Sequence, residues 1–406
     1  MKVAVIGAGA SGLMAAYAAA MKGNEVTVYE KNSKCGKKIY ITGKGRCNVT
    51  NLVPAQEFLL SVVNNAKFLT GAIYSFPPER MYAFLEDGGC RLKTERGNRV
   101  FPVSDKASDV TKCLQQYCER AGVVFKFDSK VQDISILNST VSGIIVDNNF
   151  IPYEKVIVCT GGLSYPSTGS DGDGYRFAEK SGHNLIAARP ALCGMNVKGS
   201  YCAEMQGLSL KNVKLTVYFG QKKLSEEMGE MLFTHFGISG PLVLTASSLI
   251  TRLDLNSVKL SLDLKPALDE QTLDRRLLRD FGENSNKSIF NCLKNLLPVA
   301  IIGEVLKRAG IPSEKKVNNV SRAERALLLT TVKNFDILIS SLRGFEEAII
   351  TSGGVNVKDI NPKTMQSKLV DGLYFCGEVL DVDAFTGGFN LQIAFATGFA
   401  AGNSIG

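Results

Sequence analysis

The sequence predicts an α/β fold in which both ends of the chain build one sheet and a module of β and helical parts is inserted between them. Three observations support this fold class. The first residues follow the order strand, glycine turn, helix and strand, the last residues follow the order strand, glycine turn and helix, and the pattern in between changes near residue 191. The expected domains are residues 1–190 with 341–406, and an inserted module of residues 191–340.

The composition is that of a folded chain without a membrane span. Of 406 residues, 45% are hydrophobic and 21% are charged, which excludes the collagen-like, disordered and coiled-coil classes. The longest apolar runs fall short of the roughly 20 residues of a spanning helix, and the chain starts directly with a strand. Ten cysteines form no Cys-x-x-Cys pair and only two histidines are present. We therefore expect a cytoplasmic protein with reduced thiols, no membrane contact and no metal site.

The first turn has the pattern of a dinucleotide-binding site. Gly7, Gly9 and Gly12 form Gly-x-Gly-x-x-Gly between an apolar strand and an alanine-rich helix. In this pattern the first glycine makes the tight turn, the second lets backbone approach a pyrophosphate, and the third lets the helix pack close to the strand. The amides at the start of the helix then face the phosphates. Glu30 follows the second strand 23 residues after Gly7, near the position that bonds an adenosine ribose.

A strongly basic stretch follows the motif. Residues 31–51 contain six lysines and arginines and no acid, in a chain whose net charge is +8. The stretch has one aromatic residue, Tyr40, whereas nucleic-acid-binding segments usually interleave aromatics with cations or place them on a recognition helix. We expect these cations to surround cofactor phosphates, with a solvated charge run as the alternative, and we expect no nucleic-acid partner.

The central part of the chain provides scaffold elements. Helical patterns predict helices over residues 56–69, 79–87 and 107–120, and a hairpin is expected around residues 96–98. A parallel strand at 123–127, a three-stranded meander over 131–153 and a buried strand at 156–159 follow. Asp171-Gly172-Asp173-Gly174 lacks the remaining ligands of a calcium loop, so we expect Asp173 to cap the next helix. Within the inserted module, strands are expected at 213–219 and 258–264, and helices at 269–281, 299–309 and 321–331.

The carboxy-terminal pattern favours FAD as the bound dinucleotide. A buried strand ends in Gly377-Glu378, and a glycine pair, Gly387-Gly388, opens the final helix. A chain whose first and last segments both have the form of nucleotide-binding turns closes one site from two ends, as FAD enzymes do. The inserted module has no second Gly-x-Gly-x-x-Gly, so a nicotinamide cofactor would dock transiently on the flavin face as a possible hydride donor.

Four longer motifs, residues 42–51, 160–169, 232–241 and 377–383, resemble those of a bacterial flavoprotein family. This family includes 3-dehydro-bile-acid Δ(4,6)-reductases and chains described as aminoacetone oxidase family FAD-binding enzymes, and the resemblance covers essentially the whole chain. It implies an FAD-dependent oxidoreductase with a Rossmann-like FAD-binding domain of mixed sheet plus β-meander. Two departures, Ala384-Phe385 where the family usually has a glycine and Phe389 where a tyrosine is common, put a shared substrate in doubt.

The motifs and the resemblance together imply a non-covalent FAD site. Glu378 is expected at the ribitol chain, Val131 at the adenine, and Lys38 with the 42–48 loop on the phosphate and ring side. The helix that begins near Gly388 is expected to point its positive end at flavin N1. The complete set of expected cofactor-binding residues is Gly7, Gly9, Ala10, Ser11, Gly12, Glu30, Lys31, Lys38, Thr42, Gly43, Arg46, Cys47, Asn48, Val131, Thr160, Gly161, Gly377, Glu378, Gly388, Phe389, Asn390 and Leu391.

The expected reaction is hydride transfer through flavin N5, with NAD(P)H reducing a conjugated C=C bond of a small steroid-like or enone substrate. Arg46 and Tyr165 are the candidate catalytic residues. Two alternatives remain: a flavin-dependent amine oxidase that uses O2, and a non-catalytic flavin-binding redox or RNA-associated protein. Cys47 is either a reactive thiol, even one that links the flavin, or a small buried residue. The substrate, the direction of the reaction and the oligomeric state stay open.

Overall fold

The computed structural model describes residues 1–406 as two compact units. Unit 1 comprises Met1–Ala191 and Phe345–Gly406, and unit 2 comprises Leu192–Gly344. Each unit has its own hydrophobic core. None of the helices combines the length and the apolar character that crossing a membrane requires.

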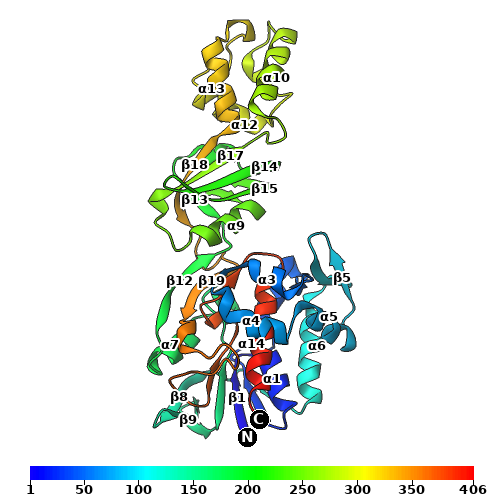
Figure 1. Cartoon of the computed structure of the whole chain (residues 1–406), viewed down its shortest axis with the longest axis vertical. Helices are drawn as coiled ribbons and strands as arrows, with labels where there is room; N and C mark the ends of the chain where they lie inside the picture. The colour runs from blue at the N-terminus through cyan, green and yellow to red at the C-terminus, as the bar shows by residue number, and fades with distance from the viewer. The chain divides into compact units, whose positions relative to one another are not determined.

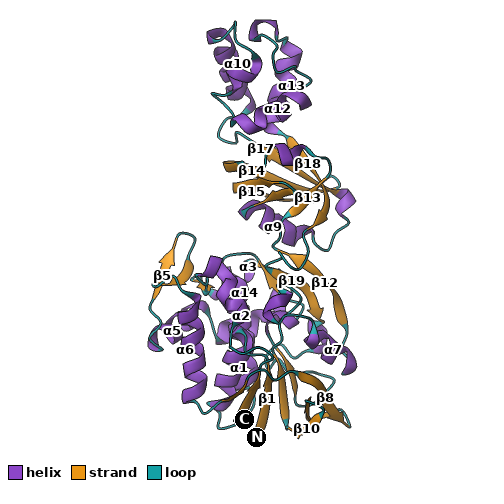
Figure 2. Cartoon of the chain, turned by 180° about the vertical axis from the view of Figure 1, so that it is seen from behind, coloured by secondary structure: helices purple, strands orange, loops and turns teal.

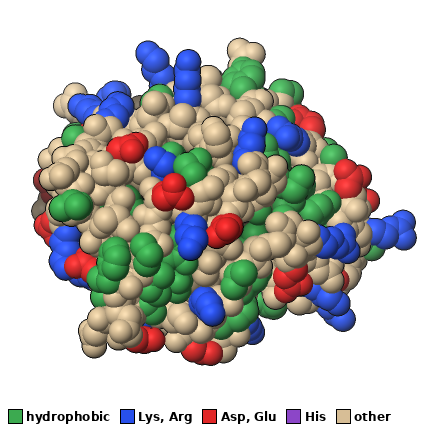
Figure 3. Space-filling model, turned by 90° about the horizontal axis from the view of Figure 1, so that it is seen from below, with side chains coloured by type: hydrophobic (Ala, Val, Ile, Leu, Met, Phe, Trp, Pro, Cys, Tyr) green, Lys and Arg blue, Asp and Glu red, His purple; other side chains and the backbone are tan.

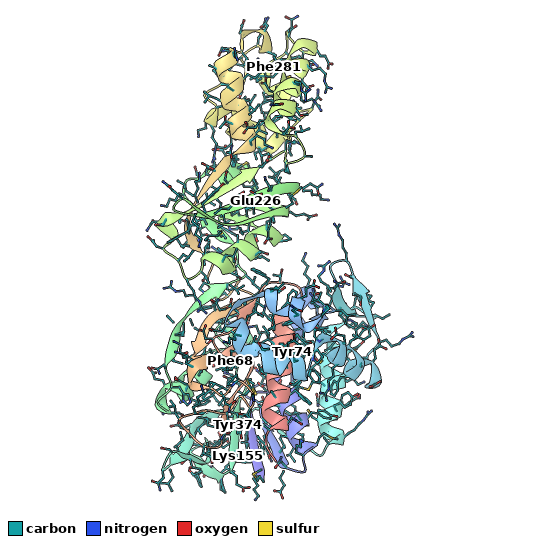
Figure 4. The ribbon with its side chains drawn as sticks, in the orientation of Figure 1. Phe68, Tyr74, Lys155, Glu226, Phe281 and Tyr374 are labelled. Carbon is teal, nitrogen blue, oxygen red and sulfur yellow. The ribbon has the colours of Figure 1, made fainter.

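A five-stranded sheet forms the centre of unit 1, in the order β20-β11-β1-β2-β7. All neighbouring strands are parallel, where a mixed sheet was expected, because the antiparallel meander forms a separate sheet. Lys155 of β11 and Tyr374 of β20, labelled in Figure 4, belong to adjacent strands of this sheet although they are far apart in the sequence. The strands are β1 (Lys2–Ile6), β2 (Glu25–Tyr29), β7 (Val124–Lys126), β11 (Lys155–Val158) and β20 (Leu373–Phe375).

The first and last helices of unit 1 pack tightly against each other. Helix α1 (Ala10–Ala20) is blue and helix α14 (Phe389–Asn403) is red in Figure 1, where they lie side by side. A Cβ at Gly398 would lie 2.3 Å from the Ser11 carbonyl oxygen, and one at Gly402 would lie 2.2 Å from that of Ala15. These contacts require glycine on α14, so the two ends of the chain are joined through backbone as well as through the sheet.

Smaller sheets complete the β-structure of unit 1. The expected meander and the hairpin around residues 96–98 are confirmed. The strands are β8 (Val131–Leu137), β9 (Thr140–Val146) and β10 (Asn149–Pro152) in the meander; β3 (Thr50–Asn51), β5 (Leu92–Glu95) and β6 (Arg99–Pro102) in a second antiparallel sheet; and the pairs β4 (Val62–Asn64) with β21 (Asp383–Ala384) and β12 (Leu185–Ala191) with β19 (Ile350–Val355).

One expected helix of unit 1 is wrong. Residues 56–69 form two helices separated by β4, because Val62 and Val63 are β-branched, Val62 and Asn64 pair with β21, and Asn65 has a left-handed φ of 60°. The helices expected at 79–87 and 107–120 are confirmed. The remaining helices of unit 1 are α2 (Lys37–Ile41), α3 (Ala55–Leu60), α4 (Ala66–Ser75), α5 (Pro78–Asp87), α6 (Ala107–Arg120) and α7 (Asp173–Lys180).

Unit 2 combines a closed β-barrel with helices. The barrel has the strand order β13-β16-β15-β14-β17-β18, which leaves no free sheet edge. Figure 2 shows these strands in orange next to the purple helices of the same unit. The strands are β13 (Met195–Val197), β14 (Ser209–Phe219), β15 (Lys222–Thr234), β16 (Gly237–Ser239), β17 (Val258–Asp263) and β18 (Phe335–Leu342); the helices are α8 (Tyr201–Glu204), α9 (Pro241–Ile250), α10 (Glu270–Glu283), α11 (Ile289–Leu293), α12 (Val299–Arg308) and α13 (Arg322–Lys333).

Candidate functional site

The glycine turn after β1 has the geometry that a dinucleotide needs. Gly7 has a φ of 101°, and a Cβ on Gly12 would lie 1.9 Å from the Gly7 carbonyl oxygen, so both positions require glycine. Gly9 is the N-cap of α1, and a Cβ placed there would meet no protein atom within 4 Å. Open space therefore lies over the start of α1. Ala10 and Ser11 form its first turn, where amide groups have no partner within the helix.

Glu30 lies at the end of β2 against this turn. Its side chain is buried, and its carboxylate accepts hydrogen bonds from the Ala8 amide at 2.8 Å and from the Asn32 amide at 2.8 Å and side chain at 2.7 Å. A carboxylate offers about four acceptor positions. The carboxylate thus anchors the glycine turn and retains acceptor capacity for a hydroxyl group.

Glu378 is held by a cluster of polar groups from distant segments. Its carboxylate accepts from Lys38 Nζ at 2.7 Å, from Ser164 Oγ at 2.6 Å and from the Thr351 amide at 2.9 Å. The preceding residue, Gly377, has a φ of 77°, and a Cβ there would lie 2.6 Å from Ser11 Oγ. The Gly377-Glu378 turn therefore lies directly against the start of α1.

The 42–51 segment lies against the start of α14. A Cβ at Gly388, the N-cap of α14, would lie 2.4 Å from the Thr50 carbonyl, and Asn51 Nδ2 donates to the Gly387 carbonyl at 3.1 Å. A Cβ at Gly43 would lie 3.0 Å from the Asn48 amide nitrogen. The structure thus brings this loop together with the glycine pair that the sequence places over 330 residues later.

Two buried atoms of this loop lack a protein partner. Asn48 Oδ1 and Thr50 Oγ1 are buried and form no hydrogen bond. Buried polar atoms are rarely left unpaired in folded proteins, so these two indicate a missing polar ligand. Together with the open space at Gly9 and the free amides at the start of α14, they fit FAD, whose phosphates and ring system carry the complementary groups.

Arg46 is fixed in ion pairs. Its guanidinium bonds Glu95 and, at 2.7 Å, Asp105, and it stacks on the Phe101 ring at 4.2 Å. The hydrogen bond from Arg46 lowers the pKa of Glu95, and those from Lys93 and Arg46 lower the pKa of Asp105. Arg46 therefore binds the hairpin of β5 and β6 and the chain just after it, which favours a structural role for this side chain over a catalytic one.

Cys47 is a buried residue rather than an activated thiol. It is fully buried, and burial raises the pKa of its thiol to about 12. A reactive cysteine needs a lowered pKa and access to solvent. Its φ of 60° sets the turn of the loop, so the interpretation as a small structural residue holds.

Lys31 faces carboxylates instead of open solvent. Its ammonium lies 2.6 Å from Asp171 and 3.0 Å from Asp173. The prediction that Asp173 caps α7 is wrong, because the N-cap is Gly172 and no side chain caps the helix. Burial acts to raise the pKa of Asp173, but hydrogen bonds and charges from Lys31 and Lys130 outweigh it and lower the pKa to about 2.

The other predicted residues occupy varied surroundings. Val131 is buried at the start of β8, and Thr42 Oγ1 donates to the Ile39 carbonyl at 2.7 Å. Thr160 Oγ1 is buried without a partner beside Gly161, whose φ is 73°. In the first turn of α14, Phe389 packs edge-on against Phe58, Asn390 bonds the backbone of Ala384 and Phe385, and Leu391 is half-buried.

Tyr165 is half-buried and its hydroxyl has no partner in the protein. Its backbone has a left-handed φ of 53° and its amide donates to the Phe345 carbonyl at 2.9 Å. It directly follows Ser164, one of the groups that hold Glu378. Of the two candidate catalytic side chains, Tyr165 is therefore the one with a hydroxyl group free to bond a substrate.

Sequence reasoning missed two residues of the Glu378 cluster. Ser164 and Thr351 are fully buried and bond Glu378. Ser164 lies in a motif that was recognised, but a serine beside a glycine turn is too common to single out. Thr351 lies on β19, and no local sequence pattern indicates that this strand passes next to Glu378.

The site of unit 1 combines a turn with room for pyrophosphate and a carboxylate at the end of β2. It also has a second glycine turn from the carboxyl end of the chain and a helix N-terminus close to buried polar atoms without partners. These features are those of an FAD-dependent oxidoreductase. The chain matches the family described as HI0933-like protein Rossmann domain over residues 1–404, and it belongs to that family.

Two relatives and one solved structure are examples of the proteins to which the chain is similar. The chain is 30% identical to 3-dehydro-bile acid Δ(4,6)-reductase of Clostridium scindens, over 99% of this chain and 98% of that one. It is 29% identical to the ribosomal RNA dihydrouridine synthase of Escherichia coli, over 99% and 97%. Its fold is similar to that of 3-ketosteroid-Δ4-(5α)-dehydrogenase from Rhodococcus jostii RHA1, with a TM-score of 0.54 at 18% identity, over 99% and 96%.

Proposed function

We propose that the protein reduces a C=C bond conjugated to a carbonyl group, with FAD as the resident cofactor and NAD(P)H as the hydride donor. One observation carries the proposal: full-length similarity at nearly equal identity to two relatives whose names describe this change. A Δ(4,6)-reductase of a 3-dehydro steroid acid acts on double bonds next to a ketone. Dihydrouridine differs from uridine by two hydrogens on a double bond conjugated to the C4 carbonyl.

The chain's own groups have defined tasks in such a reaction. FAD, when bound, supplies the two-electron hydride chemistry. The glycine turn, Glu30 and the Glu378 cluster bind and orient the cofactor. Hydride addition to the carbon β to the carbonyl places negative charge on the carbonyl oxygen, and the α-carbon must then gain a proton. We assign the proton to the Tyr165 hydroxyl, because it is half-buried and free of protein partners.

A small 3-oxo steroid or other enone is the first candidate acceptor. A uracil base in RNA is the second candidate acceptor, and the distribution of charge between the two units supports this candidate. Unit 2 has 21 lysines and arginines against 15 acids, a net charge of +6, whereas unit 1 has 26 against 24, a net charge of +2. RNA carries one negative charge per nucleotide and would be attracted to unit 2 more strongly than a steroid, which carries at most a single carboxylate.

Anaerobic half-reactions test the proposal. The flavoprotein is reduced with NADH or NADPH and then mixed with a 3-oxo-4-ene steroid, with a simple cyclic enone, or with uridine-containing RNA. We expect one acceptor class to restore the visible flavin band and to gain two hydrogens by mass spectrometry. Reoxidation by O2 alone, with reduction by an amine and formation of hydrogen peroxide, would instead identify the amine oxidase.

A further inference from the structure

We infer that the helical part of unit 2 carries an RNA-docking surface built from Lys287, Lys294, Lys316 and Arg322. We call these four residues the basic surface. The inference rests on the second candidate of the proposed function, in which the acceptor is a uracil base. It adds where the RNA binds and which side chains bind it.

The stretch that contains the basic surface is rich in cations. Residues 284–322 contain seven lysines and arginines and two glutamates, Glu304 and Glu314. Glu304 is already paired with Arg308 at 2.8 Å. Figure 1 draws the neighbouring helices α10, α12 and α13 as one group, and Figure 4 marks it by Phe281 of α10. The excess positive charge is therefore concentrated on one part of unit 2.

The four side chains of the basic surface are exposed and unpaired. None of them lies within 4 Å of a carboxylate, whereas their neighbours Arg276, Lys315 and Arg325 each bind one. The nearby acid on α13, Glu324, is neutralised by Lys315 at 2.7 Å. Cations without a carboxylate partner remain available for phosphate groups.

Backbone and side-chain contacts connect the segments that carry the four residues. The Val317 amide donates to the Lys287 carbonyl at 3.0 Å, and Ser288 pairs with Lys316 in an isolated bridge. The Phe290 amide donates to the Ser313 carbonyl at 3.2 Å, and the ammonium of Lys294 lies 5.3 Å from the Phe290 ring. Arg322 begins α13, which the Lys315–Glu324 pair ties to the same segment. The basic surface thus spans the junction of α11, α13 and the chain between α12 and α13.

The side chains around the basic surface favour RNA over a membrane. Exposed amides surround the cations and offer donors and acceptors to bases and riboses; they are Asn286, Asn291, Asn295, Asn318 and Asn319. A helix that lies on a bilayer needs large apolar side chains to insert, yet this stretch exposes only Val299 among its large hydrophobic residues. Phosphate contacts with polar neighbours are typical of RNA-binding surfaces.

The surface of unit 1 around the two chain termini provides a contrast. Figure 3 views the end of unit 1 at which Figure 1 places both termini, and there cations and carboxylates are interspersed. Unit 1 also offers exposed lysines without a carboxylate partner, namely Lys22, Lys67, Lys112 and Lys363. These four lysines allow a control variant with the same change of net charge.

The test compares two fourfold variants of the intact flavoprotein by fluorescence anisotropy with a labelled single-stranded RNA of mixed sequence. The first combines Lys287→Gln, Lys294→Gln, Lys316→Gln and Arg322→Gln, and the control combines Lys22→Gln, Lys67→Gln, Lys112→Gln and Lys363→Gln. Each phosphate contact on a single strand contributes about −0.7 to the slope of log affinity against log salt, so the first variant is expected to have a slope shallower by about 3. Its affinity at low salt should fall at least about tenfold, and the control should stay close to the parent protein.

Four results would overturn the inference: no measurable RNA binding by the parent protein, equal losses in both variants, a first variant as tight as the parent, or loss of binding to phosphatidylserine vesicles in place of RNA. The assay needs no turnover, so it separates the two proposals. RNA binding that depends on the basic surface, without reduction of uracil, would leave the inference standing and remove the uracil candidate. Enone reduction without RNA binding would leave the proposed reduction of a conjugated C=C bond standing and would remove the inference.

Discussion

Glu30 is the residue whose contribution to cofactor binding is most easily isolated. Charged hydrogen bonds contribute about 1.5–3 kcal/mol, so Glu30→Ala should weaken FAD binding roughly 10- to 150-fold. The ribose lies far from flavin N5, so the reduction rate of fully loaded enzyme should change little. Equilibrium FAD titration measures the effect. Glu25→Ala, at the exposed start of the same strand, is the matched control, and equal affinities for the two variants would remove Glu30 from the site.

Tyr165 is assigned as the proton donor, and its removal should affect only one half-reaction. A positioned general acid contributes about 10²- to 10⁴-fold, so Tyr165→Phe should slow reoxidation of the reduced flavin by an enone by that factor. Reduction by NAD(P)H should be unaffected. Stopped-flow measurement of both half-reactions checks this, with Tyr74→Phe as control because Tyr74 is 58% exposed on α4 (Figure 4). Equal slowing of both half-reactions would point to a structural role.

Asp173 should give the protein part of its resistance to acid. Its pKa is lowered from 3.8 to about 2, so its ion pairs contribute stability that is fully present above pH 4 and is lost as the pH falls toward 2. The melting temperature of Asp173→Asn should lie below that of the parent at pH 7, and the difference should shrink between about pH 4 and pH 2. A difference that is independent of pH would contradict the ion-pair interpretation.

In the glycine turn between β1 and α1, one glycine is needed for folding and another for cofactor binding. A Cβ at Gly9 meets no protein atom within 4 Å, whereas one at Gly12 would lie 1.9 Å from the Gly7 carbonyl oxygen. Gly9→Ala should therefore change the free energy of unfolding without FAD by less than about 1 kcal/mol and weaken FAD binding at least about tenfold. Gly12→Ala should lower the free energy of unfolding by about 1–3 kcal/mol. Denaturant unfolding and FAD titration of both variants provide the test, and the opposite ranking would refute the turn's assignment.

Elements with a strong local pattern were predictable, and those that depend on distant pairing were not. The glycine turn, the hairpin at residues 96–98 and α6 follow from spacing within a few residues. The break at Val62 depends on pairing with β21, over 300 residues later. Closure of the barrel likewise depends on β13 pairing with β18, which no local pattern shows. The partners of Glu378 were missed for the same reason.

At the scale of the whole molecule, the site of unit 1 is assembled from the two ends of the chain. The carboxyl end supplies β20, the Gly377-Glu378 turn and α14, and the amino end supplies the turn at Gly7 and the 42–51 loop. The general form of this arrangement was predictable because both ends carry glycine turns. The role of the positive charges in residues 31–51 was harder to predict. Lys31, Lys38 and Arg46 form ion pairs with carboxylates that are far away in the sequence.

The most direct test of the account is the flavin content of the purified protein. The protein is isolated, denatured and precipitated, and the flavin in the soluble and pelleted fractions is identified by chromatography and mass spectrometry. We predict a yellow protein that releases one unmodified FAD per chain, because Cys47, the candidate for a covalent link, is fully buried and burial raises the pKa of its thiol. A colourless chain that FAD fails to reconstitute, or flavin that stays attached to the precipitated polypeptide, would contradict the account.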